Sequence, residues 1–476
     1  MKYQRLFGWL SLIIVAIILI SPLFYWFTGI GQTAPELSAK ITSLPDGTLV
    51  SSPKAEALHS LLLPMQLERL LIYPLLLLAF QFSGTAVALR QWLEQRLTRP
   101  SANHLSNFPA PQPSLQPTTH SANSLLNQPT SLQPQPTTPP SVAAGQPTIP
   151  RPGLSRRDLL VILLFFLIFE TGLALLYLPF NFYSGFIVMH QFGLSAQNGS
   201  GWLSDWVKSL LIGLVTGGLI WTGLYGLMRR FPRRWPIPAG ATLLVLGFVF
   251  TLLTPILITP LFYKVQPLEN KDLTNRILSL TKRAGMEVKQ VEVIDASTKT
   301  TTVNAYFTGF SGDRRIVLYD TLLTGYTPNQ IEVVLAHEMG HWYYHHVFLS
   351  VLGLGVVGWL GLFVLRWLLN RTWRPLKLRG PADIGGLPYV LAVVAIASML
   401  SLPIQNGISR YAERQADWFA LTISQKPTTF INLFEHFAEQ NLSIVNPPAW
   451  EKILFYTHPP ITERIEMAKR FEKMIN

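Results

Sequence analysis

The sequence predicts a mainly α-helical membrane protein, in which a bundle of seven spanning helices carries a small, split α+β domain. Three observations lead to this class. Hydrophobic residues make up 49% of the chain and charged residues only 13%. Seven apolar stretches are each long enough to cross a hydrocarbon core of about 30 Å. The remainder contains a soluble segment in which β-branched runs lie between helix-period repeats.

The seven predicted spans differ in composition. The first follows Lys2 and Arg5, as a signal peptide would, but its apolar run is too long and no small-residue cleavage site follows, so we expect a retained anchor. The fifth contains Pro255 and Pro260, and the fourth is rich in Gly and Thr, which is typical of close helix packing. The spans lie near residues 8–30, 67–89, 159–180, 207–228, 239–262, 347–369 and 386–407.

The connection between the second and third spans has a separate character. There are 13 prolines between Pro100 and Pro152, and residues 101–150 contain no Asp, Glu, Lys or Arg. Such a stretch can neither form a helix nor pack a core. We therefore predict a disordered or polyproline-like linker over residues 99–157.

The soluble part comes from two stretches. The first contains a helix-period repeat at 272–285, the strand-like runs VEVIDAST and RRIVLYD, and a further helix. Helix-period repeats return after the seventh span. The predicted domains are 1–98 (first two spans), 99–157 (linker), 158–264 (spans three to five), 265–346 (soluble domain), 347–407 (last two spans) and 408–476 (its C-terminal helical part).

The further helix carries the motif His337-Glu338-Met339-Gly340-His341. Two histidines four apart lie on one face of a helix, so both imidazoles can reach one metal ion. Glu338 lies beside that metal, where its carboxylate can take a proton from water. This is the H-E-x-x-H zinc-protease pattern. The alternative is a polar patch on an exposed helix, but the apolar flanks indicate burial, and buried polar groups need a partner.

A catalytic zinc ion takes three protein ligands and keeps one position open. Downstream, SRYAERQADWFAL offers Glu413 and Asp417, four apart and on one helical face. We predict that Glu413 is the third ligand and that Asp417 accepts the second ring N–H of a ligating histidine. The alternative is a solvated charged face formed together with Arg410 and Arg414.

Three other ionisable residues attract attention. Glu170 lies inside the third apolar run, where an ionisable residue is a functional-site hypothesis. A buried structural hydrogen bond is an equal alternative. His345 and His346 come after the helix that carries His337 and His341, at positions along its axis from which they should not reach the same metal ion. We therefore expect them to have a structural or supporting role.

Composition excludes several classes of function. The chain contains no cysteine, which leaves His and carboxylate as metal ligands and rules out disulfides and a cysteine nucleophile. The formal net charge is +12, but clusters such as RRFPRRW at 229–235 flank apolar spans. Anionic lipid headgroups explain such clusters, and no nucleic-acid motif is present, so the expected partners are the bilayer and no nucleic acid.

Several ordered motifs resemble the membrane-embedded gluzincin peptidases typified by the type I CAAX prenyl endopeptidase, in a prokaryotic-type form. The resemblance covers roughly residues 160–476 and the first helix pair. The linker departs from it, because that connection is usually short in the family. The motifs are LPFNFYSGF, TPLFYKVQPL, NAYFTGF, RRIVLYDTLL, SRYAERQADWFA and THPPITERI.

The resemblance implies a site with one zinc ion per chain. An edge strand would receive the substrate backbone, and a downstream His and Arg would stabilise the oxyanion that forms at the scissile carbonyl. The residues implied are His337, His341 and Glu413 for zinc, Glu338, His458 and Arg464 for catalysis, and Asn304, Ala305 and Tyr306 for the substrate.

The expected function is peptide-bond hydrolysis by an integral-membrane zinc endopeptidase. Zinc lowers the pKa of water to about 7, and Glu338 takes its proton and returns one to the leaving amine. Its substrates would be membrane-associated proteins or prenylated C-terminal peptides; the first are preferred because the chain shows no eukaryotic sorting signal. The alternatives are a transporter or channel with a structural zinc site and a catalytically silent scaffold.

Two arguments on orientation disagree. The distribution of Lys and Arg predicts a multi-pass protein of the cell membrane with a cytoplasmic N-terminus and an extracytoplasmic zinc domain. The resemblance to eukaryotic peptidases implies a zinc site that faces the cytosol. We favour the charge argument. The sequence indicates no oligomeric state.

Overall fold

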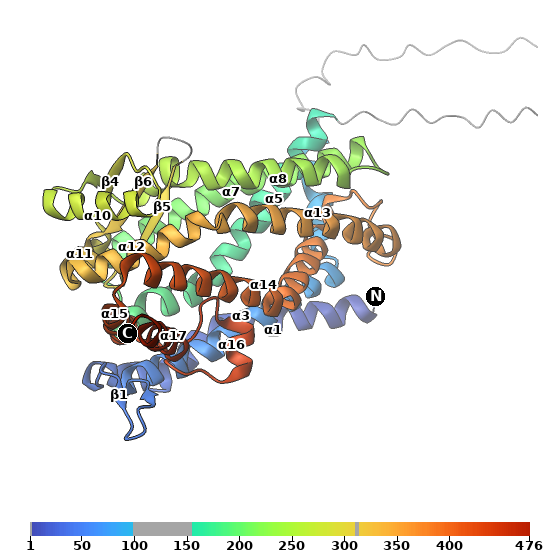
Figure 1. The fold of residues 1–476 in the computed structure, drawn as a ribbon. Coiled ribbons are helices and arrows are strands. Elements are labelled where there is room, and N and C mark those ends of the chain that lie inside the picture. Colours follow the sequence, from blue (N-terminus) through green and yellow to red (C-terminus); the bar gives the residue numbers. More distant parts are fainter. Residues whose placement is uncertain (1, 99–154, 310–313) are drawn as a thin grey trace, which may run out of the picture.

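The computed structural model describes residues 2–98, 155–309 and 314–476. Within these residues the chain is mainly helical, with a small soluble part at one end of a bundle of long helices (Figure 1). The predicted linker lies outside the described residues up to Leu154. The next residue, Ser155, caps the following helix by accepting a hydrogen bond from the backbone N–H of Asp158.

Seven helices of the described chain are long and apolar enough to cross a membrane, which confirms the predicted number. They are α1 (Lys2–Phe27), α3 (Pro53–Ser83), α5 (Arg156–Phe182), α7 (Gly199–Arg230), α8 (Pro236–Leu253), α13 (His346–Thr372) and α14 (Leu387–Ser424). Short π-helical turns continue α5 and α8 into α6 (Val188–Gln191) and α9 (Thr259–Phe262). The remaining helices of this part are α2 (Ile30–Thr33) and α4 (Thr85–Thr98).

Two spans differ most from their predicted limits. The second was expected at 67–89, but α3 begins at Pro53 and ends at Ser83, because Gly84 adopts a left-handed conformation with φ of 87°. The seventh continues without interruption to Ser424, well past the expected residue 407. One continuous helix therefore runs from the membrane span into the soluble part.

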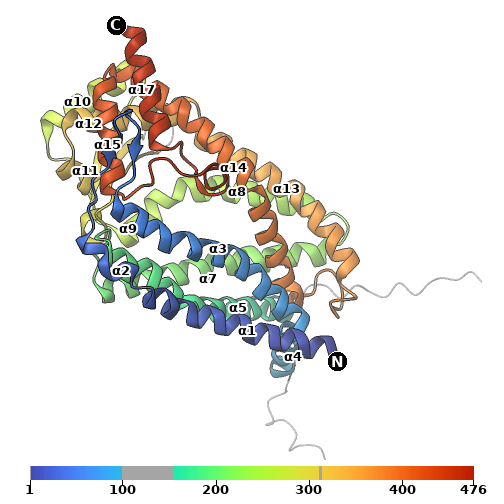
Figure 2. The ribbon, with the colours of Figure 1, turned by 90° about the horizontal axis from the view of Figure 1, so that it is seen from below.

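The seven spans form a closed ring. Neighbouring helices pack in the order α1, α3, α14, α13, α8, α7 and α5, and α5 returns to α1. Figure 2 shows this arrangement, with α1, α3 and α5 opposite α8 and α13. Many apolar side chains of the spans, such as Leu219, Val245 and Leu360, are exposed, as expected for helices in contact with lipid.

The soluble part contains a four-stranded sheet with the order β3-β4-β6-β5. The strands β4 (Gln290–Ile294) and β6 (Arg315–Tyr319) are parallel, and β3 (Val265–Pro267) and β5 (Ala305–Thr308) pair antiparallel at the two edges. The two runs that the sequence identified as strands are β4 and β6. A hairpin, β1 (Thr42–Ser43) with β2 (Leu49–Val50), lies in the first loop and was not predicted.

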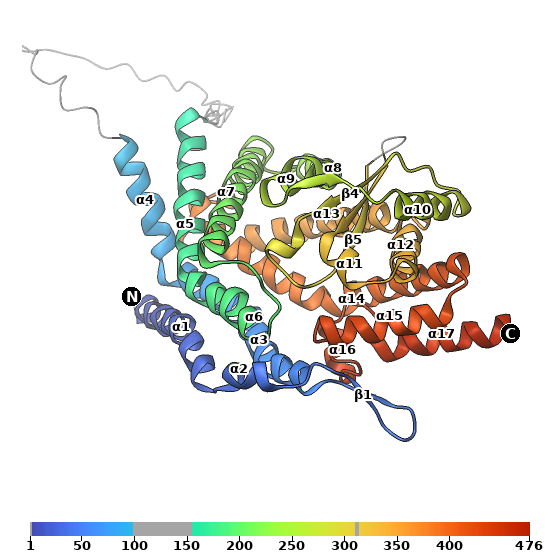
Figure 3. The ribbon, with the colours of Figure 1, turned by 90° about the vertical axis from the view of Figure 1, so that its left-hand side faces the viewer.

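Six further helices complete this part: α10 (Lys271–Arg283), α11 (Asp320–Gly325), α12 (Pro328–Tyr343), α15 (Pro427–Gln440), α16 (Ala449–Phe455) and α17 (Ile461–Ile475). Figure 3 shows the strands beside α12, with α15 and α17 on the same side of the molecule. One buried core joins both stretches of the split domain, with Leu335 and Ile316 from the first and Phe430 and Ile465 from the second. The domain therefore forms only when the last two spans have brought its parts together.

Candidate active site

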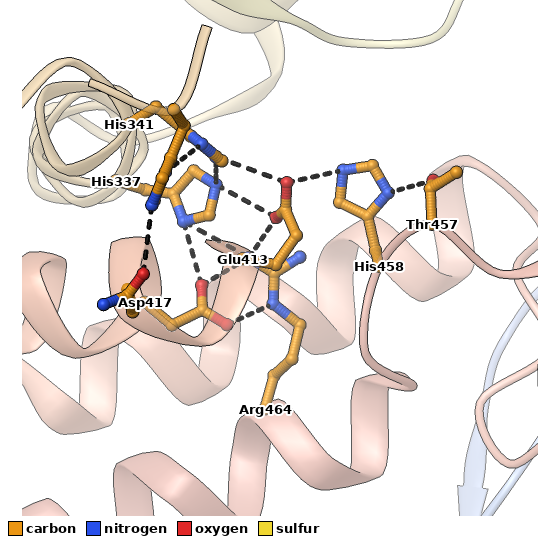
Figure 4. A network of polar contacts seen from close by, with 9 residues as sticks. His337, His341, Glu413, Asp417, Thr457, His458 and Arg464 are labelled. Carbon is orange, nitrogen blue, oxygen red and sulfur yellow. Dashed lines mark hydrogen bonds and ion pairs between the residues drawn. The ribbon is translucent and has the colours of Figure 1, made fainter. Parts of the chain in front are cut away.

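The helix α12 positions both histidines of the H-E-x-x-H motif. Its start is fixed by a capping box between Thr327 and Gln330, with Pro328 in the first helical position. His337 and His341 lie one turn apart, and their Nε2 atoms are 3.1 Å from each other (Figure 4). Both imidazoles therefore point to one place, as the spacing predicts.

The helix α14 brings Glu413 to the same place. One of its carboxylate oxygens lies 3.3 Å from Nε2 of His337 and the other lies 3.2 Å from Nε2 of His341. Zinc binds such ligands at about 2.0–2.1 Å, which places neighbouring ligand atoms about 3.3 Å apart, and each oxygen of Glu413 is at about this distance from one of the two histidines. The three residues are the group of His, Asp and Glu side chains within the described chain that could hold a metal.

Behind the ligands, Asp417 supports His337. The Nδ1 atom of His337 lies 2.9 Å from Oδ1 of Asp417, and Asp417 has no exposed surface. Arg464 donates from Nε to the other oxygen of Asp417 at 2.8 Å. A carboxylate held in this way fixes the tautomer that leaves Nε2 of His337 free for a metal. Arg464 therefore lies beside the Nδ1 edge of His337, with its Nη2 atom 3.4 Å from that nitrogen.

The second histidine has its own partner. Nδ1 of His341 lies 3.0 Å from Nδ1 of His346, whose Nε2 is 3.1 Å from the side-chain oxygen of Gln415. His345 adopts a left-handed conformation with φ of 56° and forms the bend between α12 and α13. Neither belongs to the metal-holding group.

The electrostatics suit a metal. Burial alone would lower the pKa of His337, but the neighbouring carboxylates of Asp417 and Glu413 outweigh it and raise the pKa to about 10. Burial raises the pKa of Glu338, against the opposing effect of the two histidines. A buried acidic cluster that draws protons onto an imidazole will also attract a divalent cation.

A cavity of about 450 Å³ opens in front of this cluster. His337, Glu338 and His458 line it, and so do Asn304 and Ala305 at the start of the edge strand β5. One wall is apolar and consists of four side chains from α15: Phe430, Leu433, Phe434 and Phe437.

Of the remaining predicted residues, His458, Arg464 and Asn304 line this cavity, whereas Tyr306 does not. Nε2 of His458 is 3.3 Å from Glu413, and its Nδ1 is 2.8 Å from the hydroxyl of Thr457. Asn304 uses its side-chain oxygen to accept from the backbone N–H of Ala305 at 2.8 Å. Tyr306 lies on the other face of the sheet, where it packs with Tyr263 and Tyr319.

Glu170 does not line this cavity. It is half-buried in α5. The sequence also gave no signal for the apolar wall on α15, because helix-period Phe and Leu residues look the same in a core and in a cavity. The link between Arg464 and Asp417 joins two distant segments and was likewise not expected.

Two family models match the sequence. Peptidase family M48 matches residues 267–472, which hold the whole candidate site. The model described as CAAX prenyl protease N-terminal, five membrane helices, matches residues 144–264.

Individual relatives agree with these matches. An uncharacterized metalloprotease, YhfN, of Bacillus subtilis is 32% identical over 60% of this chain and 68% of its own length. The CAAX prenyl protease 1 homolog of Arabidopsis thaliana is 30% identical with the same coverage. The crystal structure of S. mikatae Ste24p matches the fold with a TM-score of 0.67 at 22% identity, over 96% of this chain and 98% of that one.

Proposed function

Because the chain belongs to peptidase family M48 and is a multi-pass membrane zinc metalloprotease related to the CAAX prenyl proteases, we propose that it cleaves internal peptide bonds at the His337, His341 and Glu413 site. The observation that carries this proposal is geometric. Three ligand atoms meet at zinc-like separations beside Glu338, and a cavity with an edge strand lies directly in front of them.

His337, His341 and Glu413 would hold one zinc ion. Their nitrogen and oxygen atoms are the ligands that zinc prefers, and Oε2 of Glu413 is buried without a hydrogen-bond partner among the described residues. When bound, zinc supplies a Lewis acid that makes water acidic enough to act near neutral pH.

Glu338 is the proposed proton carrier. Its side chain faces the cavity between the histidines and the edge strand, within reach of a water beside the ligands. It takes a proton from the attacking water as the carbon–oxygen bond forms, and it gives a proton to the amine as the carbon–nitrogen bond breaks. The raised pKa that burial gives Glu338 suits a group that must both accept and return a proton.

His458 and the strand β5 would position the substrate. An extended peptide can pair with the free edge of β5, so that its scissile carbonyl lies in front of His337 and Glu338. His458 also lines the cavity and suits stabilisation of the oxyanion. Arg464 acts through Asp417 and His337, and we propose it as a positioning residue.

The substrate class follows from the cavity and its surroundings. The apolar wall on α15 suits apolar side chains or a prenyl group next to the cleaved bond. We propose membrane-associated proteins as the main substrates and prenylated C-terminal peptides as a second class, since relatives are named CAAX prenyl protease 1 homologs. A transporter with a structural zinc site fits less well, because such a site is usually closed by four ligands, whereas three residues meet here.

The decisive variant is Glu338→Gln, which keeps the shape of the side chain but removes the base. We expect the purified full-length protein to retain its zinc and to lose hydrolysis of a casein-type or farnesylated peptide by at least about a hundredfold. Near wild-type cleavage by this variant would contradict the mechanism.

Glu413→Gln is the matched comparison, since it makes the same chemical change at a metal ligand on another helix, α14. It should lower zinc occupancy, measured by elemental analysis, as well as activity. Full occupancy would move the third ligand to another residue.

A further inference from the structure

A second cavity lies at the other end of the bundle. Its volume is about 700 Å³, and it is lined by residues of α4, α5, α7 and α13 and of the segments that follow α7 and α13. The helix α13 starts next to the zinc helix and rises about 1.5 Å per residue, so Arg366 in this cavity lies about 30 Å farther along than His346. Figure 1 shows α13 running away from α12.

The cavity is strongly basic. Five arginines and three carboxylates line it, which gives a formal charge of +2. The arginines are Arg90, Arg229, Arg233, Arg366 and Arg379, and the carboxylates are Glu94, Asp158 and Asp383.

The carboxylates are already engaged by three of these arginines. The pairs are Arg90 with Asp383, Arg229 with Asp158 and Arg379 with Glu94. Arg233 and Arg366 remain, and neither forms an ion pair with any residue that the structure describes. Two positive charges of the cavity thus have no counter-charge from the described chain.

Two buried nitrogen atoms in this cavity also lack a hydrogen-bond acceptor. Arg90 is only 4% exposed, and its Nε has no hydrogen-bond partner among the described residues. A carboxylate oxygen of Glu94 lies 4.0 Å from that atom, which is too far for a hydrogen bond. The Nε of Arg366 is likewise buried without a partner. A buried charged donor without an acceptor is unfavourable, so an acceptor that fits here would be stabilising.

That acceptor does not come from an acidic side chain of the long connection that starts after α4, because residues 99–154 contain no Asp or Glu. A phosphate group has the matching chemistry, since its oxygens accept paired hydrogen bonds from planar guanidinium groups. The cavity lies at the ends of membrane spans, where lipid headgroups are found.

We propose that this cavity binds a phosphate group, held by Arg233 and Arg366 and by the free Nε of Arg90. The phosphate belongs to a lipid headgroup or to a soluble phosphoester, and both present the same oxygens to the guanidinium groups. The site is separate from the peptidase site and does not depend on its chemistry.

The test compares two double variants of the full-length, zinc-loaded protein in neutral detergent. Arg233→Gln with Arg366→Gln should weaken binding of short-chain phosphatidic acid on the order of tenfold or more. Arg230→Gln with Arg374→Gln removes the same charge from exposed arginines that do not line the cavity, and it should leave the affinity within about twofold. Native mass spectrometry measures the bound lipid, with phosphatidylcholine as the neutral reference.

Competition identifies the source of the phosphate. If glycerol 3-phosphate or inorganic phosphate displaces phosphatidic acid, the site takes a soluble phosphoester; if neither does, it takes a headgroup. Equal losses in the two double variants, or no preference for phosphatidic acid over phosphatidylcholine, would overturn the proposal. If the variant with Arg233→Gln and Arg366→Gln unfolds at a lower temperature than the wild type in the absence of lipid, Arg233→Gln alone replaces it in the comparison, because Arg233 is exposed.

Discussion

Asp417 lies completely out of contact with solvent, yet it accepts hydrogen bonds from a histidine and an arginine at once. The arginine satisfies the charge of the carboxylate, and the carboxylate in turn orients His337 toward the metal. The guanidinium group of Arg464 also lies over the ring of Phe434, with 3.9 Å to its centroid. Phe434 belongs to the apolar wall of the cavity. Arg464, which holds Asp417 behind the metal ligand His337, therefore also packs against the proposed substrate pocket.

Asp417→Asn should weaken zinc binding without removing a ligand. The amide cannot satisfy Arg464 and hold the correct tautomer of His337 equally well, so we expect about 10- to 100-fold lower zinc affinity. Competition with a chelator measures this, and Glu466→Gln, at an exposed position on α17, is the control. Unchanged affinity in Asp417→Asn would contradict the support that we assign to this residue.

Zinc binding should also depend on pH. The pKa of His337 is raised from 6.5 to about 10 in the metal-free protein. The protonated ring therefore stabilises the metal-free fold fully below pH 6.5, and this stabilisation is lost as the pH rises through about 10. Zinc needs the neutral ring and must displace that proton. We therefore expect apparent zinc affinity to increase with pH between about 7 and 9, by up to about tenfold per unit.

Zinc titrations against a chelator, corrected for the chelator's own protonation, measure this slope. Asp417→Asn removes one cause of the raised pKa and should reduce the slope. An affinity that stays constant across this range would mean that His337 is already neutral in the metal-free protein.

At the scale of elements, the site depends on how closely α12 approaches α14. Gly340, between the two histidines, lies against Ala416: a Cβ at Gly340 would be 2.8 Å from the Cα of Ala416 and 3.1 Å from the Cβ of Phe419. Backbone cannot move aside as a flexible side chain can. The glycine of the motif therefore sets the distance between the ligand pair on α12 and Glu413 on α14.

Gly340→Ala should separate these helices and lower zinc occupancy, with a loss of stability of about 1–3 kcal/mol. Gly358→Ala is the matched control, because that glycine is also helical and no atom lies within 4 Å of a Cβ built there. Elemental analysis and thermal unfolding compare the two. Normal zinc content in Gly340→Ala would show that the packing can relax without moving Glu413.

At the scale of the whole molecule, the connections after the first, third and fifth spans (the odd connections) lie at one end of the ring, and those after the second, fourth and sixth spans (the even connections) lie at the other. The first loop contacts the peptidase part, since Ile41 donates to Glu439 and Val445 donates to Ser51. The third-span loop also docks there, through the bridge between Ser195 and Thr300. Basic residues concentrate in the even connections, which contain Arg90, Arg96, Arg229, Arg230, Arg233, Arg234, Arg371, Arg374, Lys377 and Arg379.

We predict from this charge distribution that the zinc site is extracytoplasmic. Residues 181–206 contain no Lys or Arg, and residues 31–66 contain only Lys40 and Lys54, so the positive-inside rule keeps the even connections in the cytoplasm. A phosphatase that is active only outside the cytoplasm, fused after Asn476, should be active. A fluorescent protein that folds only in the cytoplasm should glow when inserted near Lys377 and stay dark at the C-terminus. The reverse pattern would place the zinc site in the cytosol.

The sequence by itself determined the features that depend on local spacing. Hydrophobic runs of sufficient length predicted seven spans, and the structure has seven such helices. The fold class was predicted in the same way and agrees with the fold match to S. mikatae Ste24p. The positions of His337 and His341 on one helical face follow from 3.6 residues per turn, a property of the backbone that needs no partner.

Only the tertiary structure decided which distant elements meet. The pairing of Arg464 with Asp417, the contact between His341 and His346, and the wall on α15 each need a particular packing of helices, which periodicity does not encode. The arginine cavity joins three connections that are far apart in sequence, each of which looks like an ordinary basic flank of a span. Such a site differs from an ordinary basic flank because some of its arginine atoms are buried and because arginines from all three connections meet in one cavity. Both features arise only when the helices close into a ring.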